Sequence, residues 1–183
     1  MIRFLDIVLS LFGLLFLSPV MLILLVAGIF DTGSPVFRQI RLGRDQQKFM
    51  LVKFRTMRKE AESVASHLAD ASLITPFGHF LRRTKLDELP QLWNVLIGNM
   101  SIVGPRPALF NQYDLIELRT SKGVHHLSPG LTGWAQVNGR DDLSIAKKVK
   151  FDTEYLKKKS FIFDLKILSL TILKIIRREG IQH

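Results

Sequence analysis

The chain has no cysteine and few acidic residues. Without cysteine, disulfides and thiolate metal sites are excluded. Only 16 aspartate and glutamate residues stand against 26 lysine and arginine residues, so the formal net charge is +10. The five histidines show no zinc-like spacing. Such a basic balance suits phosphate-bearing partners, namely nucleic acids, nucleotides or anionic lipid headgroups.

Apolar residues make up 47% of the chain and charged residues 23%, and the mean hydropathy is still positive at +0.18. This combination indicates a strongly apolar segment joined to a charged domain. The 183 residues leave room for one globular domain and a membrane element.

Residues 7–30 contain no charged side chain. As a straight helix of about 24 residues they would extend about 36 Å, enough to cross a hydrocarbon core of about 30 Å. Ser18-Pro19 lies near the middle, where proline removes a helical hydrogen bond and the serine hydroxyl can bond the freed carbonyl. Two topologies stay open: a kinked helix that crosses once, or a re-entrant hairpin of two short helices that returns to the same face.

Basic residues are far more numerous after this segment than before it, which places the globular part in the cytoplasm in either topology. Residues 36–41 and 48–54 alternate around a polar turn and predict a β-hairpin. Thr75-Pro76 opens a helix, and a further helix is expected from Asp87 to Gly98 with Trp93 in the core. The fold class is therefore α+β and mostly helical.

A second apolar segment at residues 161–178 is interrupted by charges, so it is a poor spanning segment. Its pattern fits an amphipathic helix at the membrane interface, with lysines toward the headgroups. A core helix of the soluble domain explains the same pattern.

Asp87 and Glu88 are adjacent carboxylates among cations. Asp87 could simply cap a helix. However, Arg82 lies upstream, and Arg106 stands between two prolines, which prepares its planar side chain for bidentate phosphate contact. One carboxylate could attack a phosphate while its neighbour holds Mg²⁺, because Mg²⁺ is usually bound by one or two carboxylates together with substrate phosphates.

Four segments carry a family resemblance: Lys53-Phe54-Arg55-Thr56-Met57, Leu86-Asp87-Glu88-Leu89-Pro90-Gln91-Leu92-Trp93-Asn94-Val95, Met100-Ser101-Ile102-Val103-Gly104-Pro105-Arg106-Pro107 and Pro129-Gly130-Leu131-Thr132-Gly133-Trp134-Ala135-Gln136-Val137-Asn138-Gly139-Arg140. In these segments the chain resembles the bacterial sugar transferases, the monotopic phosphoglycosyl transferases that begin glycan assembly on undecaprenyl phosphate. The resemblance extends over essentially the whole chain, including the Ser-Pro break.

The resemblance implies a two-step exchange with a UDP-sugar and undecaprenyl phosphate as substrates. Asp87 would take the phosphosugar with release of UMP, and the lipid phosphate would then attack this covalent intermediate. Glu88, with Asp87, would belong to a Mg²⁺ site, and Arg82, Arg106 and Arg140 would contact substrate.

The resemblance also favours the re-entrant topology. It implies a re-entrant membrane helix at residues 1–32, broken at Ser18 and Pro19, and a catalytic domain at residues 33–183 on the cytoplasmic face of the bacterial inner membrane. That domain would include the interfacial helix at residues 161–178. A homo-oligomer stays open, and a nucleic-acid partner is not expected, because basic and aromatic residues are not interleaved as in single-strand binders.

Lys85, Leu73 and Asn99 depart from the usual family pattern, but none of them replaces Asp87, Glu88 or Arg106. The short form of the chain is typical of members that use N-acetylated amino sugars or diacetamido sugars. Two alternatives remain: a hexose-1-phosphate transferase of the same family, and a non-enzymatic basic module anchored to the membrane.

Overall fold

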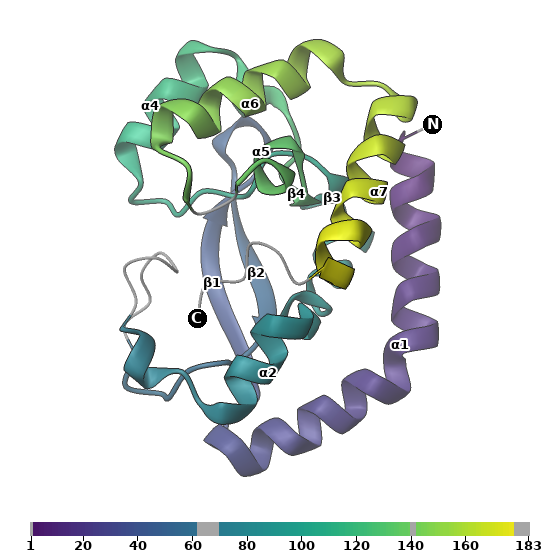
Figure 1. Ribbon diagram of the computed structural model, residues 1–183, viewed down its shortest axis with the longest axis vertical. Coiled ribbons are helices and arrows are strands. Elements are labelled where there is room, and N and C mark those ends of the chain that lie inside the picture. The colour runs from purple at the N-terminus through teal and green to yellow at the C-terminus, as the bar shows by residue number, and fades with distance from the viewer. Residues whose placement is uncertain (1, 62–69, 140–141, 178–183) are drawn as a thin grey trace.

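A computed structural model of the chain describes residues 2–61, 70–139 and 142–177. The α-helices are α1 (Ile2–Thr32), α2 (Pro76–Thr84), α3 (Gln91–Leu96), α4 (Tyr113–Ser121), α5 (Trp134–Val137), α6 (Ile145–Lys158) and α7 (Phe161–Arg177). The strands are β1 (Val36–Leu42), β2 (Lys48–Phe54), β3 (Ser101–Val103) and β4 (Gly130–Thr132). Short 3-10 turns are η1 (Arg44–Gln46), η2 (Ala71–Leu73), η3 (Leu86–Glu88) and η4 (Val124–His126). The fold is mostly helical with two small sheets, as expected (Figure 1).

α1 is one continuous helix that bends along its length (Figure 1). Pro19 lies inside it and cannot donate to the Leu15 carbonyl, which the Ser18 hydroxyl bonds instead at 2.7 Å. The predicted role of Ser18 is therefore confirmed, but the expected pair of short helices is a single bent one. Most of its apolar side chains are exposed, and by length and composition α1 is long and apolar enough to enter or cross a membrane.

The N-terminal part of α1 contacts the globular part of the chain through polar groups. Arg3 donates to the carbonyls of Val95 (2.6 Å) and Leu96 (2.7 Å), at the end of α3. The buried Asp6 carboxylate accepts hydrogen bonds from the Ser101 hydroxyl (2.9 and 3.0 Å) and the Ile102 backbone N–H (2.8 Å), in β3.

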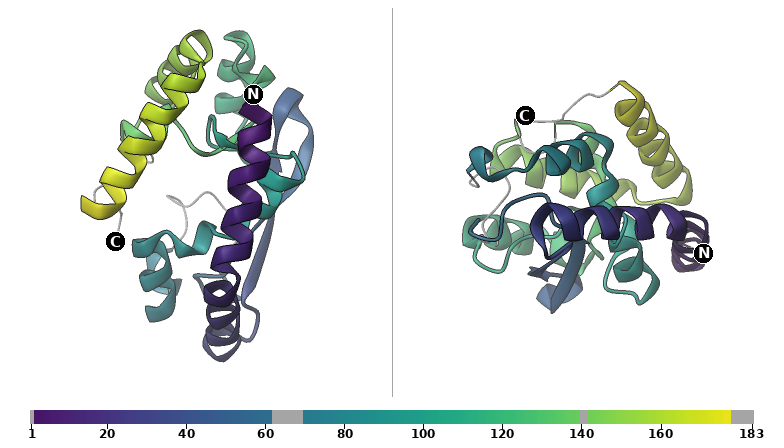
Figure 2. Two further views of the ribbon diagram at one scale, coloured as in Figure 1. Left: turned by 90° about the vertical axis from the view of Figure 1, so that its right-hand side faces the viewer. Right: turned by 90° about the horizontal axis from the view of Figure 1, so that it is seen from below.

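The C-terminal part of α1 contacts the same globular part through apolar packing. Leu24 forms a buried cluster with Phe54 of β2 and Leu81 of α2. At the end of the helix, Asp31 accepts a hydrogen bond of 2.7 Å from the Thr75 hydroxyl. Thus α1 is attached to one domain on both sides of its bend. It runs along the outside of the molecule in Figure 1 and faces the viewer in the left view of Figure 2.

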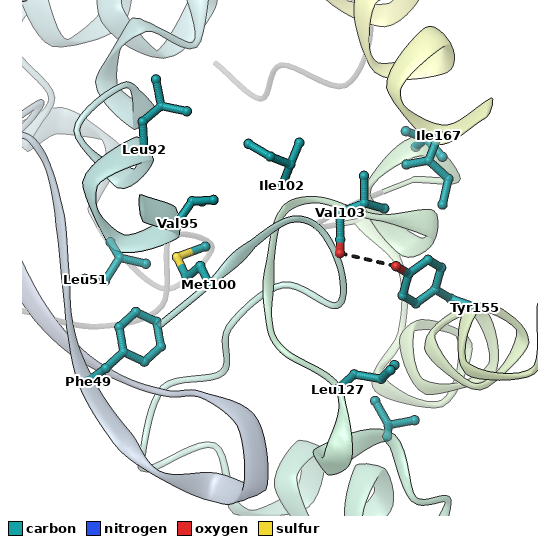
Figure 3. Packing of buried hydrophobic residues seen from close by; sticks show 12 residues of the cluster. Phe49, Leu51, Leu92, Val95, Met100, Ile102, Val103, Leu127, Tyr155 and Ile167 are labelled. Atoms are coloured by element: carbon teal, nitrogen blue, oxygen red, sulfur yellow. Dashed lines mark hydrogen bonds between the residues drawn. The ribbon is translucent and has the colours of Figure 1, made fainter. Parts of the chain in front are cut away.

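The predicted β-hairpin is confirmed, with β1 and β2 pairing antiparallel from Val36–Phe54 to Leu42–Lys48. The second sheet, in which β3 and β4 pair in parallel, was not predicted. The largest core cluster lies around this second sheet and joins β2, α3, α6 and α7 (Figure 3). In it the Tyr155 hydroxyl lies 3.2 Å from the Val103 carbonyl.

α2 begins as predicted, because the Thr75 hydroxyl caps it by accepting from the Gly78 N–H at 2.9 Å. The prediction of a helix from Asp87 was wrong. Residues 86–88 form η3, and α3 begins only at Gln91, after Pro90. The prediction that Trp93 lies in the core was also wrong, since its side chain is 52% exposed.

α7 combines the two interpretations of its sequence pattern. Ile167 is fully buried in the core, and Phe163, Leu168 and Leu170 pack against that core. Other apolar side chains are exposed on its outer side, with Ile162 and Ile176 the most exposed. The helix is therefore amphipathic, but one side of it completes the core.

Candidate active site

The turn that carries Asp87 and Glu88 rests on apolar side chains. Leu86 and Leu89, one on each side of the two acids, pack against the buried cluster that α1, β2 and α2 share. Lys85, just before the turn, has φ of 60° and ends α2 in the left-handed conformation. The backbone therefore reverses abruptly here, and Asp87 becomes a buried residue instead of the predicted helix cap.

Asp87 is only 7% exposed, and this burial is the main reason that its pKa rises to about 7. The negative charge of Glu88 raises the pKa further. Lys53, Arg82 and Arg106 act in the opposite direction and favour the ionised carboxylate. The carboxylate thus lies in an environment with one negative and three positive neighbours.

Lys53 is a site residue that was given no role from the sequence. It lies in β2, is partly buried, and its ammonium is 5.3 Å from the centre of the Phe37 ring. Burial is the main cause that lowers its pKa to about 8; Arg82 and Arg106 lower it too, while Asp87 and Glu88 raise it. A lysine placed between Val52 and Phe54 of a predicted strand was the available signal, but a charge in a strand is more often on a solvated face.

Arg82 and Arg106 reach this cluster from different elements. The Arg82 Nε of α2 donates to the Thr56 hydroxyl at 2.9 Å. The Arg106 Nη1, from the loop after β3, lies 3.5 Å from Glu88 Oε1. The structure therefore brings together four of the five residues predicted for catalysis and substrate binding. The fifth, Arg140, lies outside the described residues.

The donor groups of this cluster fit a hard divalent cation. Within residues 2–61, 70–139 and 142–177 there is no group of three or more histidine, cysteine, aspartate and glutamate side chains suited to a metal. Two adjacent carboxylates, one of them with a raised pKa, are nevertheless a donor set that Mg²⁺ accepts, since substrate phosphates and water complete its coordination. Asp87 and Glu88 are the residues that could hold it.

The arrangement combines a carboxylate with cations that suit a phosphate group. A buried carboxylate is a competent nucleophile once ionised, and the surrounding lysine and arginines can neutralise phosphate oxygens. Leu24 of α1 belongs to the apolar cluster on which the turn rests, so this chemistry would take place close to the apolar helix.

Known proteins resemble this chain over most of its length. The sequence pattern of the family described as bacterial sugar transferase matches residues 1–178. The uncharacterised sugar transferase EpsL of Bacillus subtilis is 43% identical, and the match covers 99% of this chain and 90% of that protein.

Two further relatives are longer proteins. The UDP-glucose:undecaprenyl-phosphate glucose-1-phosphate transferase of Escherichia coli is 44% identical, over 92% of this chain and 39% of its own length. The UDP-galactose-lipid carrier transferase of Erwinia amylovora is 37% identical, over 97% of this chain and 41% of its own length. The chain thus spans well under half of these two relatives. The match over nearly all of its own residues shows that the chain belongs to the bacterial sugar transferase family.

Proposed function

We propose that this protein transfers a sugar 1-phosphate from a UDP-sugar to undecaprenyl phosphate, with Asp87 as the nucleophile. The observation that carries the proposal is the buried Asp87 carboxylate with Lys53, Arg82 and Arg106 around it. The names of the Escherichia coli and Erwinia amylovora relatives, which refer to UDP-sugars and a lipid carrier, support the substrate classes.

In the first step, an Asp87 carboxylate oxygen attacks the phosphorus that bears the sugar. A bond forms between that oxygen and phosphorus, and the bond from phosphorus to the bridging oxygen of the diphosphate breaks, so UMP leaves with the bridging oxygen. In the second step, an oxygen of undecaprenyl phosphate attacks the same phosphorus and Asp87 leaves as a free carboxylate. The products are UMP and undecaprenyl diphosphate sugar.

Cations on the protein make this attack feasible. Lys53, Arg82 and Arg106 favour the ionised form of Asp87 and reduce its repulsion from the anionic diphosphate. Mg²⁺, held by Glu88 and Asp87, would supply further neutralisation of the phosphate oxygens. Chelation of divalent cations should therefore stop UMP release, and added Mg²⁺ should restore it.

UMP release from purified protein tests the assignment of the nucleophile. Asp87→Asn keeps the size of the side chain but removes the attacking carboxylate, so UMP release should fall to background, and Glu88→Ala should reduce it strongly. Mass spectrometry after incubation with the UDP-sugar alone should find a phosphosugar on the peptide that contains Asp87. Normal turnover in Asp87→Asn, or an adduct on another residue, would contradict the covalent mechanism. Normal turnover would also be the result expected of a non-enzymatic membrane module with a contaminating activity.

For the donor sugar there are two candidates. The first is the N-acetylated amino sugar or diacetamido sugar suggested by the family resemblance, and this stays a prediction. The names of the relatives refer to glucose and galactose, which favours a hexose. Turnover with a panel of UDP-sugars, including UDP-glucose, UDP-galactose and UDP-N-acetylglucosamine, separates the two.

The proposed topology is re-entrant, with the catalytic domain at residues 33–183 on the cytoplasmic face of the bacterial inner membrane. Its support is that α1 is attached to one domain at both ends, through Asp6 near its start and Asp31 near its end. A helix that crossed the bilayer could not bring both ends to a domain on one side. An introduced cysteine, Ile2→Cys, should react with a membrane-impermeant maleimide only when the cytoplasmic side is accessible; labelling from the periplasm alone would contradict the hairpin.

A further inference from the structure

The loop that carries Arg106 is held to other elements through a run of carbonyl oxygens. Pro105 and Pro107 have no N–H, so neither can donate a backbone hydrogen bond of its own. Four successive carbonyls accept hydrogen bonds from other elements: Pro105 from Gly130 N (2.8 Å), Arg106 from Arg119 Nη1 (2.8 Å), Pro107 from Arg41 Nη1 (3.2 Å) and Ala108 from Leu42 N (2.9 Å). Two of the four donors are thus arginine side chains.

Arg119, in α4, reaches the Arg106 carbonyl from a fixed position. Its Nε (3.0 Å) and Nη2 (2.7 Å) both donate to Asp152 Oδ2 of α6, while Nη1 donates to the loop. The two side chains are only 11% and 2% exposed. Burial of an ion pair costs free energy unless its hydrogen bonds are well made, so this pair is a poor choice for stability alone. With Nε and Nη2 of Arg119 bound to Asp152, the remaining donor, Nη1, points at the Arg106 carbonyl.

Arg41, in β1, donates to the Pro107 carbonyl, the one after that of Arg106. It is 8% exposed, and its Nε and Nη2 donate to Gln39 Oε1 at 3.0 and 2.6 Å. Gln39 and Arg41 therefore occupy the buried face of β1, while Ile40 between them is 41% exposed. A strand that only needed stability would place the apolar residue inward. Because the polar residues of β1 face inward instead, Arg41 can donate to the Pro107 carbonyl.

We propose that Arg41 and Arg119, the latter oriented by Asp152, are positioning residues that fix the Arg106 side chain opposite Glu88. The proposal rests on the proposed function, in which Arg106 contacts a substrate phosphate. The Arg106 guanidinium ends 3.5 Å from Glu88, so it lies where a diphosphate bound at the two acids would need a cation. A long side chain keeps such a position only if its backbone is held, and the bonds to its own carbonyl and the next one provide that.

Arg119→Lys tests the proposal with little change in charge or volume. A lysine can still pair with Asp152, but its single ammonium cannot replace a planar fork that donates to two partners at fixed angles. We expect kcat/KM for UMP release to fall about 10- to 100-fold, because small displacements of a binding group have effects of that size. Arg41→Lys should act in the same way. Arg38→Lys, on the exposed face of the same strand, is the matched control and should change kcat/KM less than twofold.

A double-mutant cycle with Arg106→Ala separates positioning from a general structural effect. If Arg119 acts through Arg106, Arg119→Lys should lower kcat/KM in the parent and change it little in the Arg106→Ala background. Thermal unfolding of each variant accompanies the cycle. Should Arg119→Lys fail to fold, Arg41→Lys is judged by the same criteria.

Two results would overturn the proposal: kcat/KM within twofold of the parent in the folded lysine variants, or the same fractional loss with and without Arg106. The proposed function has its own control in Asp87→Asn. If Asp87→Asn is inactive while Arg106→Ala keeps parental activity, the covalent mechanism stands and the positioning proposal falls. If Asp87→Asn keeps normal turnover, the proposed function itself falls.

Discussion

The turn at residues 86–89, which carries Asp87 and Glu88, rests on apolar side chains. The loop at residues 104–108, which carries Arg106, is instead held by hydrogen bonds, four of them to its carbonyls. Leu86 and Leu89 pack on a cluster that includes Leu24 of α1. The loop is attached to β1, β4 and α4, inside the globular part. Apolar contacts are non-directional, while hydrogen bonds fix direction as well as distance.

The difference means that the two halves of the site depend on different parts of the molecule. The position of the carboxylates depends on a cluster that α1 shares with β2 and α2, and that of Arg106 depends on hydrogen bonds in the interior of the domain. The two halves meet at the Glu88–Arg106 contact of 3.5 Å. Separate substitutions can disturb each half.

The largest effect on activity is expected from removing the Arg106 side chain, which the loop carries. Arg106→Ala should lower kcat/KM for UMP release by about 10²- to 10³-fold, because a preorganised donor to a developing phosphate charge is lost. Thermal unfolding should change little, since the guanidinium is partly exposed and the carbonyl anchors remain. Arg38→Ala, on an exposed face, is the control. Activity within a few-fold of the parent would remove Arg106 from the site.

The apolar cluster under the turn should be weakened most directly at Leu81, which is fully buried in it. Leu81→Ala should lower the free energy of unfolding by about 2–5 kcal/mol through lost burial and the cavity left behind. Denaturant unfolding of the protein in detergent measures this. His79→Ala, exposed in the same helix, should have almost no effect. Equal stability of Leu81→Ala and the parent would mean that the cluster does not hold the turn.

The base of the loop is sensitive at Gly104, where there is no space for a methyl group. A Cβ there would press against the Ser128 carbonyl oxygen and lie 2.9 Å from the Gly130 nitrogen, and both are backbone atoms. Gly104→Ala should therefore cost about 1–3 kcal/mol of stability and also lower UMP release, because the shift is passed to Arg106. Gly43→Ala, whose closest neighbour is the Phe49 ring at 3.2 Å, should be milder. The reverse order would contradict this account of the loop.

The smallest effect concerns Asp6, the polar contact of α1 with the strand that leads into the loop. Asp6→Asn keeps one oxygen that can accept from the Ile102 N–H. It removes the negative charge that strengthens the hydrogen bonds from Ser101 and Ile102, so the free energy of unfolding should fall by about 1 kcal/mol. UMP release should be nearly unchanged. Glu60→Gln, an exposed carboxylate, should have no measurable effect. A loss of activity as large as that of Arg106→Ala would show that α1 controls the loop as well as the turn.

Features encoded within a few residues were predictable from the sequence. The hairpin followed from alternation around a polar turn, and the hydrogen bond of Ser18 followed from the chemistry of a serine before a helical proline. The start of α3 was not predictable in this way. Leu86 and Leu89 match the helical spacing of the residues that follow, but in the structure they pack against the buried cluster of α1, β2 and α2, and residues 86–88 form a separate 3-10 turn.

Trp93 was misjudged and Lys53 was missed for the same reason. Trp93 has the periodicity of a core residue, but its side chain is exposed; it lies on α3, against which α1 packs through Gly13 and Leu92. Lys53 has the character of a surface residue, but it is partly buried and close enough to Asp87 for each charge to shift the pKa of the other. Burial depends on which element lies opposite, and periodicity specifies only which residues share a face.

The sequence by itself determined the pair of acids, the two prolines around Arg106, the break at Ser18-Pro19 and the excess of basic charge, because these are properties of neighbouring residues or of composition. Only the tertiary structure decided that Lys53, Arg82 and Arg106 surround Asp87, and that Arg41 and Arg119 hold the loop. Arg41 is 66 residues from Pro107, and Arg119 is 33 residues from Asp152. Contacts at such separations arise when packed elements meet, and no local pattern in the chain specifies which elements those will be.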